Sequence, residues 1–176
     1  MCNCDSMYLG RVGHSRSLVT ATGTAVTVES TQDKPYVASV FELPCAALTT
    51  GGHSVLEKLL VQESVEADAD VRRPALRAHI FNRLPTTPVA NVVYVPQLDR
   101  HIGTIMIEAG VAEASDQWRK WRRISTKAHQ AHVRADLDLP AYSGESSIWL
   151  VLVADATVTP AAATSVTVHA AIRKHT

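Results

Sequence analysis

The sequence has few aromatic residues and no surplus of either charge. Aromatic residues make up 5% of the 176 residues, and 17 Lys and Arg are balanced by 17 Asp and Glu. A chain without net charge has no global field to steer it toward nucleic acid or an anionic membrane. We therefore expect neither nucleic acid nor a membrane as a partner, and we expect any charge-dependent contact to be local.

Cysteine and long apolar runs are also scarce. Cys2, Cys4 and Cys45 are odd in number, and two of them form a C-x-C near the start, which is not the framework of a disulfide-rich secreted fold. The longest apolar run, Ile148 to Ala154, falls far short of the about 20 residues that span a bilayer. The first residues lack the apolar stretch of an export signal. We expect an unexported protein in a reducing compartment.

Alternating Val, Thr and Ala residues are what the sequence has in plenty. In LVTATGTAVTV, residues 18–28, the alternation places Val19, Ala21, Gly23 and Ala25 on one face without a charge. A period of two is typical of a half-buried strand. The same reasoning predicts further strands at 35–43, 54–64, 74–82, 91–95, 101–109, 127–139, 146–154 and 164–172.

Short strands separated by turns indicate an all-β protein. Pro-rich and Gly-rich turns lie between the strands, and no long helical stretch supplies the crossovers of a parallel sheet. We predict an antiparallel β-sandwich, specifically a jelly roll, over residues 18–176, with a polar N-terminal arm over residues 1–17. The segments 54–62 and 114–123 could instead form short helices, which would not change the class.

The stretch RAHIFNRLPTTPVANVVYV, from Arg77 to Val95, consists of two extended runs around a break that holds two prolines. Proline cannot donate to a β-ladder, so the ladder should stop within the break. In the first run the period places Ala78 and Ile80 on one face, and His79 and Phe81 on the other. We interpret the stretch as a joint between two core strands.

No motif predicts catalysis. A Gly-x-Ser-x-Gly elbow is missing, and the fragment GGHS at residues 51–54 is more typical of a glycine turn than of a nucleophile. Asp136 and Asp138 would share one strand face, as a pair of glycosidase carboxylates could, but solvated carboxylates are the commoner case. We expect no catalytic residue and no enzymatic activity.

The candidate metal-binding residues do not form a set that could hold one ion. The C-x-C has no second pair, and His129 and His132 would point to opposite faces of the predicted strand. The acidic stretch at residues 63–70 lacks the order of an EF-hand and is more typical of a solvated loop. We expect neither a metal nor another cofactor.

The strongest local charge feature is DQWRKWRRI, residues 116–124, in which tryptophans alternate with basic residues. Such a mixture can stack bases and bind phosphates, but Trp and Arg are also enriched at protein interfaces. In a neutral protein we favour the protein interface. The candidate interface residues are Trp118, Arg119, Trp121, Arg122 and Arg123, with Met1, Tyr8 and Arg11 from the arm.

Three segments together resemble a family of small structural proteins of tailed-bacteriophage virions. They are HIFNRLPTTPVAN at residues 79–91, HIGTI at 101–105 and SSIWLVLVADATVTPAAATSVTV at 146–168. The family pattern has a "lhlFnaaPt.iaDNa.f" core, then a "yiG.i" strand, a "ytP" turn and a last "f.v.l" strand. The residues at matching places are Phe81, Asn82, Pro85, Asn91, Gly103 and Pro160.

The resemblance runs from about Thr20 to Ile172, because residues 33–52 are also similar to the family's "y.agDvvg" segment and its glycine pair. It does not cover the arm. The chain departs from the pattern at Ala90, where the family has Asp, and at Leu84, where a small residue is usual. The basic segment from Trp118 to Arg123 is particular to this chain.

The resemblance implies a virion structural protein without enzymatic activity or cofactor. The expected role is that of a capsid cement or decoration protein, which binds the head surface and stabilises the shell by bridging neighbouring capsomers. Its partners would be the major capsid protein and other copies of itself, with a homotrimer as the natural unit at threefold axes. It would be assembled in the host cytoplasm. The alternative is a tail or baseplate module that binds a host glycan through aromatics such as Tyr94, Trp121, Tyr142 or Trp149. Of these, Trp149 lies within an apolar run and is expected in the core.

Overall fold

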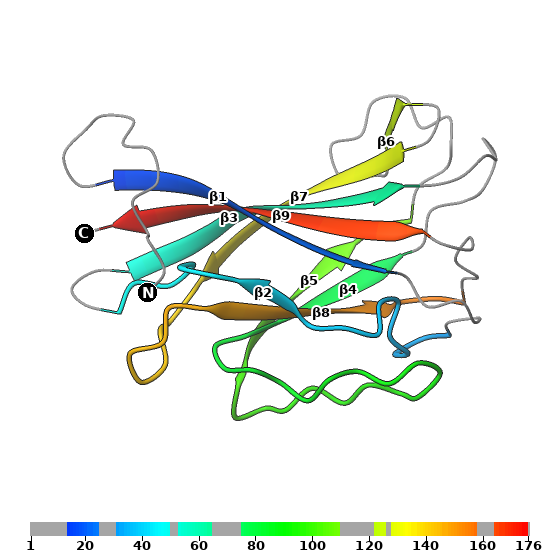
Figure 1. Cartoon of the computed structure of the whole chain (residues 1–176), viewed down its shortest axis with the longest axis horizontal. Helices are drawn as coiled ribbons and strands as arrows, with labels where there is room; N and C mark the ends of the chain where they lie inside the picture. The colour runs from blue at the N-terminus through cyan, green and yellow to red at the C-terminus, as the bar shows by residue number, and fades with distance from the viewer. Residues whose placement is uncertain are drawn as a thin grey trace.

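The computed structural model describes residues 14–24, 31–49, 53–64, 75–109, 122–125, 128–157 and 164–175, which are all-β (Figure 1). No helix in these ranges is long and apolar enough to cross a bilayer. The described strands are β1 (His14–Thr24), β2 (Phe41–Leu43), β3 (His53–Ser64), β4 (Leu76–Phe81), β5 (His101–Ile107), β6 (Arg122–Ser125), β7 (Ala128–Asp138), β8 (Ile148–Ala154) and β9 (Ser165–His175).

The strands form two antiparallel sheets, which confirms the predicted β-sandwich. One sheet has the order β1-β9-β3-β7-β6 and the other the order β2-β8-β4-β5. Figure 1 shows them as an upper and a lower layer. The pairings are nested along the chain: β1 with β9, β2 with β8, β3 with β7 and β4 with β5. The chain thus behaves as one long antiparallel ribbon that is folded back over itself.

The core between the sheets is built by alternation. In β9, Val166, Val168, Ala170 and Ile172 are fully buried, while the residues between them are only partly buried. β3 interrupts this alternation with a register shift between Leu56 and Lys58, which is a β-bulge. Because a bulge inserts one extra residue, Leu56 and Leu59 both face the core. That three-residue spacing is why the segment also fits a helical face in sequence.

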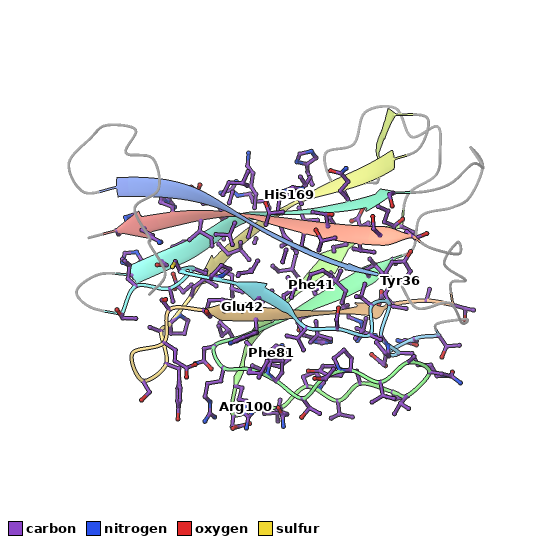
Figure 2. All side chains as sticks on the ribbon, viewed as in Figure 1. Tyr36, Phe41, Glu42, Phe81, Arg100 and His169 are labelled. Carbon is purple, nitrogen blue, oxygen red and sulfur yellow. The ribbon has the colours of Figure 1, made fainter. Side chains whose placement is uncertain are left out.

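The two central strands of the four-stranded sheet, β4 and β8, are buried on both faces. In β4, Ala78 and Ile80 belong to the core between the sheets, whereas Phe81 belongs to a second cluster with Tyr94, Val151 and Val153. The predicted alternation of β4 is therefore correct. Residues 82–100, which we call the 82–100 loop, cover the outer face of this sheet (Figures 1 and 2).

The strand predicted at residues 91–95 is wrong. Asn91 has a φ of 63° and the Val92 amide donates to the Val89 carbonyl at 3.1 Å, so the chain turns at this point. None of the described strands pairs with the segment, and Val92, Val93 and Val95 are exposed to solvent. The joint therefore links β4 to β5 through a long irregular loop.

The N-terminal boundary and the cysteines also differ from expectation. β1 begins at His14, because β9 extends to His175 and supplies a partner for the last four residues of the predicted arm. Residues 1–13 lie outside the described part. Cys45 is disulfide-bonded. The cysteine count did not lead us to expect this bond.

Candidate interaction surface

Exposed aliphatic side chains gather on the 82–100 loop. Of the large exposed hydrophobic residues in the described part, the loop carries six, with exposed fractions from 51% to 86%. A group of this size in one segment is typical of a contact surface for another molecule. The six residues are Leu84, Val89, Val92, Val93, Val95 and Leu98.

The two ends of the loop are fastened to each other. The Asn82 amide donates to the Arg100 carbonyl at 3.0 Å, and Arg100 Nη1 donates to the Leu84 carbonyl at 2.6 Å. Arg83 Nη2 lies 2.6 Å from Asp99 Oδ2 and forms an ion pair. These contacts cross-link residues that are far apart along the loop, so they give its ends a fixed shape.

The far part of the loop is anchored by Tyr94. Its ring is 9% exposed and meets Phe81 edge-on, with 6.4 Å between the ring centroids. Its amide donates to the Asp33 carbonyl at 2.8 Å, and Lys34 Nζ donates to Asn91 Oδ1 at 2.7 Å. Burial raises the pKa of Tyr94 to about 12. The aliphatic side chains are therefore presented on a preformed surface.

Two histidines and a threonine form a polar triad on the sheet beneath the loop. His79 Nδ1 in β4 and His101 Nε2 in β5 each lie 3.0 Å from Thr104 Oγ1, and 3.4 Å from each other. The hydroxyl has one proton, so it can donate to one ring and accept from the other. Burial, then the neighbouring His101 and Arg77, lowers the pKa of His79 to about 4. Burial also lowers the pKa of His101. Both rings are thus neutral at pH 7.

Ion pairs and stacking hold the neighbouring segments in place. Arg77 of β4 pairs with Asp33, and its Nε lies 2.7 Å from Asp155 Oδ1. The Arg83 guanidinium lies 4.1 Å from the centre of the Tyr142 ring and donates to Tyr142 Oη at 3.1 Å. One face of the Tyr142 ring is therefore covered, and Tyr94 is buried. Neither offers a bare aromatic platform for a sugar.

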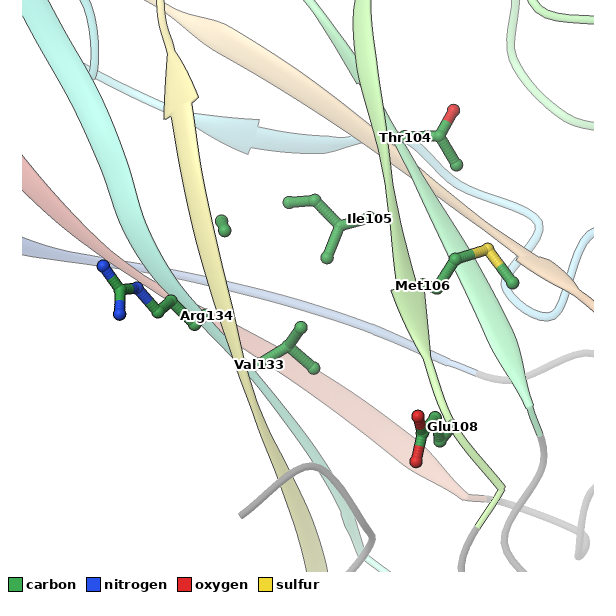
Figure 3. Close-up of a pocket in the computed structure, with 7 residues that line it drawn as sticks. Thr104, Ile105, Met106, Glu108, Val133 and Arg134 are labelled. Atoms are coloured by element: carbon green, nitrogen blue, oxygen red, sulfur yellow. The ribbon is translucent and has the colours of Figure 1, made fainter.

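A hollow lies between β5 of the four-stranded sheet and β7 of the five-stranded sheet (Figure 3). Its walls include Met106, Glu108, Val133 and Arg134. Next to it, Arg134 pairs with Asp136, one of the two carboxylates considered as a possible acid pair. In the GGHS fragment, Ser54 is buried and its Oγ accepts from the Leu48 amide at 3.1 Å, which is a structural contact.

The structure places only two of the residues predicted for an interface. Arg122 and Arg123 lie in β6, at the edge of the five-stranded sheet, where their backbones pair with Gln130 and His129. The other six predicted residues lie outside the described part, so that interface stays a prediction. They are Met1, Tyr8, Arg11, Trp118, Arg119 and Trp121.

The 82–100 loop was missed as a surface because its valines resemble a strand. One signal was available in the sequence: the valines do not alternate with polar residues, and Pro88 and Pro96 bound the run on both sides. Among the described side chains, no group of three or more His, Cys, Asp or Glu residues is placed to hold a metal ion.

No protein-family model and no curated protein match the sequence. Some solved viral structures contain chains with a weak likeness to this one. A chain of turnip yellow mosaic virus is 15% identical, with 97% of this chain and 85% of that chain covered and a TM-score of 0.30. A chain of Desmodium yellow mottle tymovirus is 12% identical, with 97% and 94% covered and a TM-score of 0.29. Likeness at these TM-scores does not decide function.

Proposed function

We propose that this protein is a structural component of a virion, namely a capsid cement or decoration protein that binds the head surface and bridges neighbouring capsomers. The observation that carries the proposal is the 82–100 loop, with six exposed aliphatic residues on a preformed surface. A partner protein that buries these side chains gains the free energy of removing them from water. Many such weak contacts, repeated over a shell, would stabilise it.

The winding of the chain supports this role. Nested pairs from β1 with β9 to β4 with β5 are what a jelly roll requires, and we infer that the sandwich is one. Jelly rolls occur in viral capsid domains and in lectins. These two uses correspond to the two candidate roles, shell contact and glycan binding. The resemblance to tailed-bacteriophage virion proteins favours the first.

The side chains of the loop also favour a protein partner over a glycan. Aliphatic residues suit the dry centre of a protein interface, whereas sugar recognition relies on exposed aromatic rings. In the described part, Tyr94 is 9% exposed and Arg83 lies over the Tyr142 ring. The proposed partners are the major capsid protein and further copies of this chain, in a homotrimer, on a capsid assembled in the host cytoplasm. The role needs no catalysis and no cofactor.

A triple variant, Val89→Ser, Val95→Ser and Leu98→Ser, tests the loop. These side chains are 62%, 76% and 86% exposed, so the variant should fold with an unchanged melting temperature. We expect it to lose co-sedimentation with purified heads that lack the protein. Leu18→Ser is the matched control, because Leu18 is 71% exposed but lies in β1 of the other sheet. Wild-type occupancy of the folded triple variant would contradict the proposal.

Two further experiments separate the alternatives. Electron cryo-microscopy of intact virions should place the density on the head, and density on the tail with a reproducible glycan-array signal would favour the adhesin instead. The double variant Trp118→Ala and Trp121→Ala tests the other predicted interface. We expect this variant to be released from heads.

A further inference from the structure

The imidazoles of His79 and His101 lie against the ring that anchors the 82–100 loop. The His79 ring is 6.0 Å from the Tyr94 ring and 5.4 Å from the His101 ring, measured between centroids. The Phe81 ring meets Tyr94 and His101 edge-on, at 6.4 Å and 5.4 Å. A change in the two imidazoles therefore also changes the packing of the ring that holds the loop in place.

The hydrogen bonds of the polar triad accept few protons. Thr104 Oγ1 lies 3.0 Å from both His79 Nδ1 and His101 Nε2, and these two nitrogens are 3.4 Å apart. When both rings are neutral, one nitrogen can donate to the hydroxyl while the other accepts from it. When both rings are protonated, two N–H groups and two positive charges converge on one hydroxyl. The triad is therefore compatible with at most one charged ring.

The other described groups around His79 do not compensate for a positive charge. Arg77 on the same strand is itself positive, and Asp33, the carboxylate nearby, is already paired with Arg77. On the β8 side, the residue opposite His79 is the buried Val151. On the loop side, the Tyr94 hydroxyl is neutral, because burial raises its pKa to about 12. A protonated His79 would thus lie buried without a counter-ion of its own among the described residues.

We propose that acid opens the 82–100 loop and thereby regulates the contact surface that the loop carries. Opening exposes the two imidazoles to water, where a histidine has a pKa of about 6.5. In the closed state burial, then the neighbouring His101 and Arg77, lowers the pKa of His79 to about 4. Between these values the open state binds a proton that the closed state does not. Lowering the pH through this window therefore favours the open state, and raising the pH restores the closed one.

The effect on a virion rests on the proposed function. In the closed loop the six aliphatic side chains are held on a preformed surface, so binding costs little ordering. An open loop would have to be ordered again at each binding event, which weakens the contact. Heads should therefore hold the protein at pH 7.5 and release it at pH 5.

Hydrogen–deuterium exchange of the free full chain tests the opening without heads. The Tyr94 amide, which donates to the Asp33 carbonyl at 2.8 Å, reports on the loop. After correction for the intrinsic pH dependence of exchange, its protection factor should fall by about tenfold or more between pH 7.5 and pH 5. The Leu139 amide, which donates to the Ser54 carbonyl at 2.8 Å beside the other sheet, is the internal control and should keep its protection.

Two variants assign the opening to His79. His79→Gln keeps a polar side chain that does not titrate, so its Tyr94 protection should change little with pH; His79→Asn is the substitute if the Gln variant does not fold at pH 7.5. His169→Gln is the matched control, because His169 lies in the other sheet and contacts Thr20 Oγ1 at 2.9 Å. It should behave as the wild type does. Tyr94 protection that is independent of pH in the wild type, or that falls equally in the folded His79 variant, would overturn the proposal.

Co-sedimentation with heads that lack the protein separates this inference from the proposed function. We expect the wild type to bind at pH 7.5 and to be released at pH 5, and His79→Gln to stay bound at both. Equal binding of the wild type at the two pH values would overturn the acid release. Absence of binding at pH 7.5 would instead overturn the proposed function, and the exchange of the free protein would still decide whether acid opens the loop.

Discussion

The imidazole of His79 makes the sheet beneath the 82–100 loop sensitive to acid. Its pKa is about 4 in the folded protein, while the pKa of an exposed histidine is about 6.5. Between these values the unfolded chain binds a proton that the folded chain does not. The free energy of unfolding therefore falls as the pH drops from about 6.5 to 4, and the stabilisation is fully present above that window.

We expect His79→Gln to lose this pH dependence. The amide can still bond with Thr104 but does not titrate. Urea unfolding at pH 7.5 and pH 4.5 should show a loss for the wild type that exceeds the loss for the variant by about 2 kcal/mol. Carboxylates titrate in both proteins, so the difference between the two losses isolates His79. An equal loss in both would contradict the assignment.

Asn91 provides a second test at the residue scale, because its φ of 63° is left-handed. Glycine adopts this conformation freely, whereas alanine loses about 1–2 kcal/mol. Both Asn91→Gly and Asn91→Ala remove the amide that binds Lys34, so each controls for the other. Chemical unfolding should show Asn91→Ala to be the less stable by about 1 kcal/mol or more. Equal stabilities would mean that the turn relaxes.

At the scale of strands, the closure of the sandwich beside β1 depends on the missing side chain of Gly23. A Cβ there would lie 2.9 Å from Val37 Cγ1, 2.9 Å from Ser39 Oγ and 3.2 Å from Phe41 Cε1. Val37 and Phe41 are buried and cannot move aside easily. Because Gly23 has no side chain, β1 can approach residues 37–41 closely.

Thermal unfolding should show Gly23→Ala to be destabilised by about 1–3 kcal/mol, as an overpacked core is. Gly103→Ala is the matched comparison, because its Cβ would meet only the flexible tip of Leu137, at 3.0 Å. Its effect should be smaller. A Gly23→Ala protein that melts with the wild type would show that β1 does not depend on this close approach.

The strands that could be predicted from sequence are those whose burial follows from the pattern of their own residues. β8 and β9 follow from apolar and alternating residues alone, and β4 shows the predicted two faces. The strand prediction at residues 91–95 failed because Val favours strands, yet no strand in the described part of the chain pairs with this segment. The signal against a strand was weak: the valines do not alternate with polar residues, and Pro88 and Pro96 bound the run.

For the whole molecule, the two outer faces differ in character. The four-stranded sheet is covered by the 82–100 loop and its aliphatic side chains. The outer face of the five-stranded sheet carries His169 (Figure 2) and the exposed Thr20 and Thr22. If the protein is a capsid cement, the first face should meet the shell. The second face should remain in solvent.

Hydrogen–deuterium exchange with and without heads can test this orientation. We expect slower exchange on binding in residues 82–100 and little change in β1 and β9. Backbone amides of Val93 and Val95 are the sensitive reporters, because their side chains are exposed in the free protein. Protection confined to β1 and β9 would show that the protein binds through the opposite face.

The position of β9 has a consequence for how the protein is made. β9 is the last of the described strands along the sequence, yet it lies between β1 and β3. During synthesis, both neighbours emerge from the ribosome long before the strand that joins them. The growing chain must therefore keep two open strand edges apart, and its five-stranded sheet can close only after β9 has been synthesised. At high concentration, a strand from another nascent copy could pair in the place of β9, between β1 and β3, and produce a domain-swapped assembly.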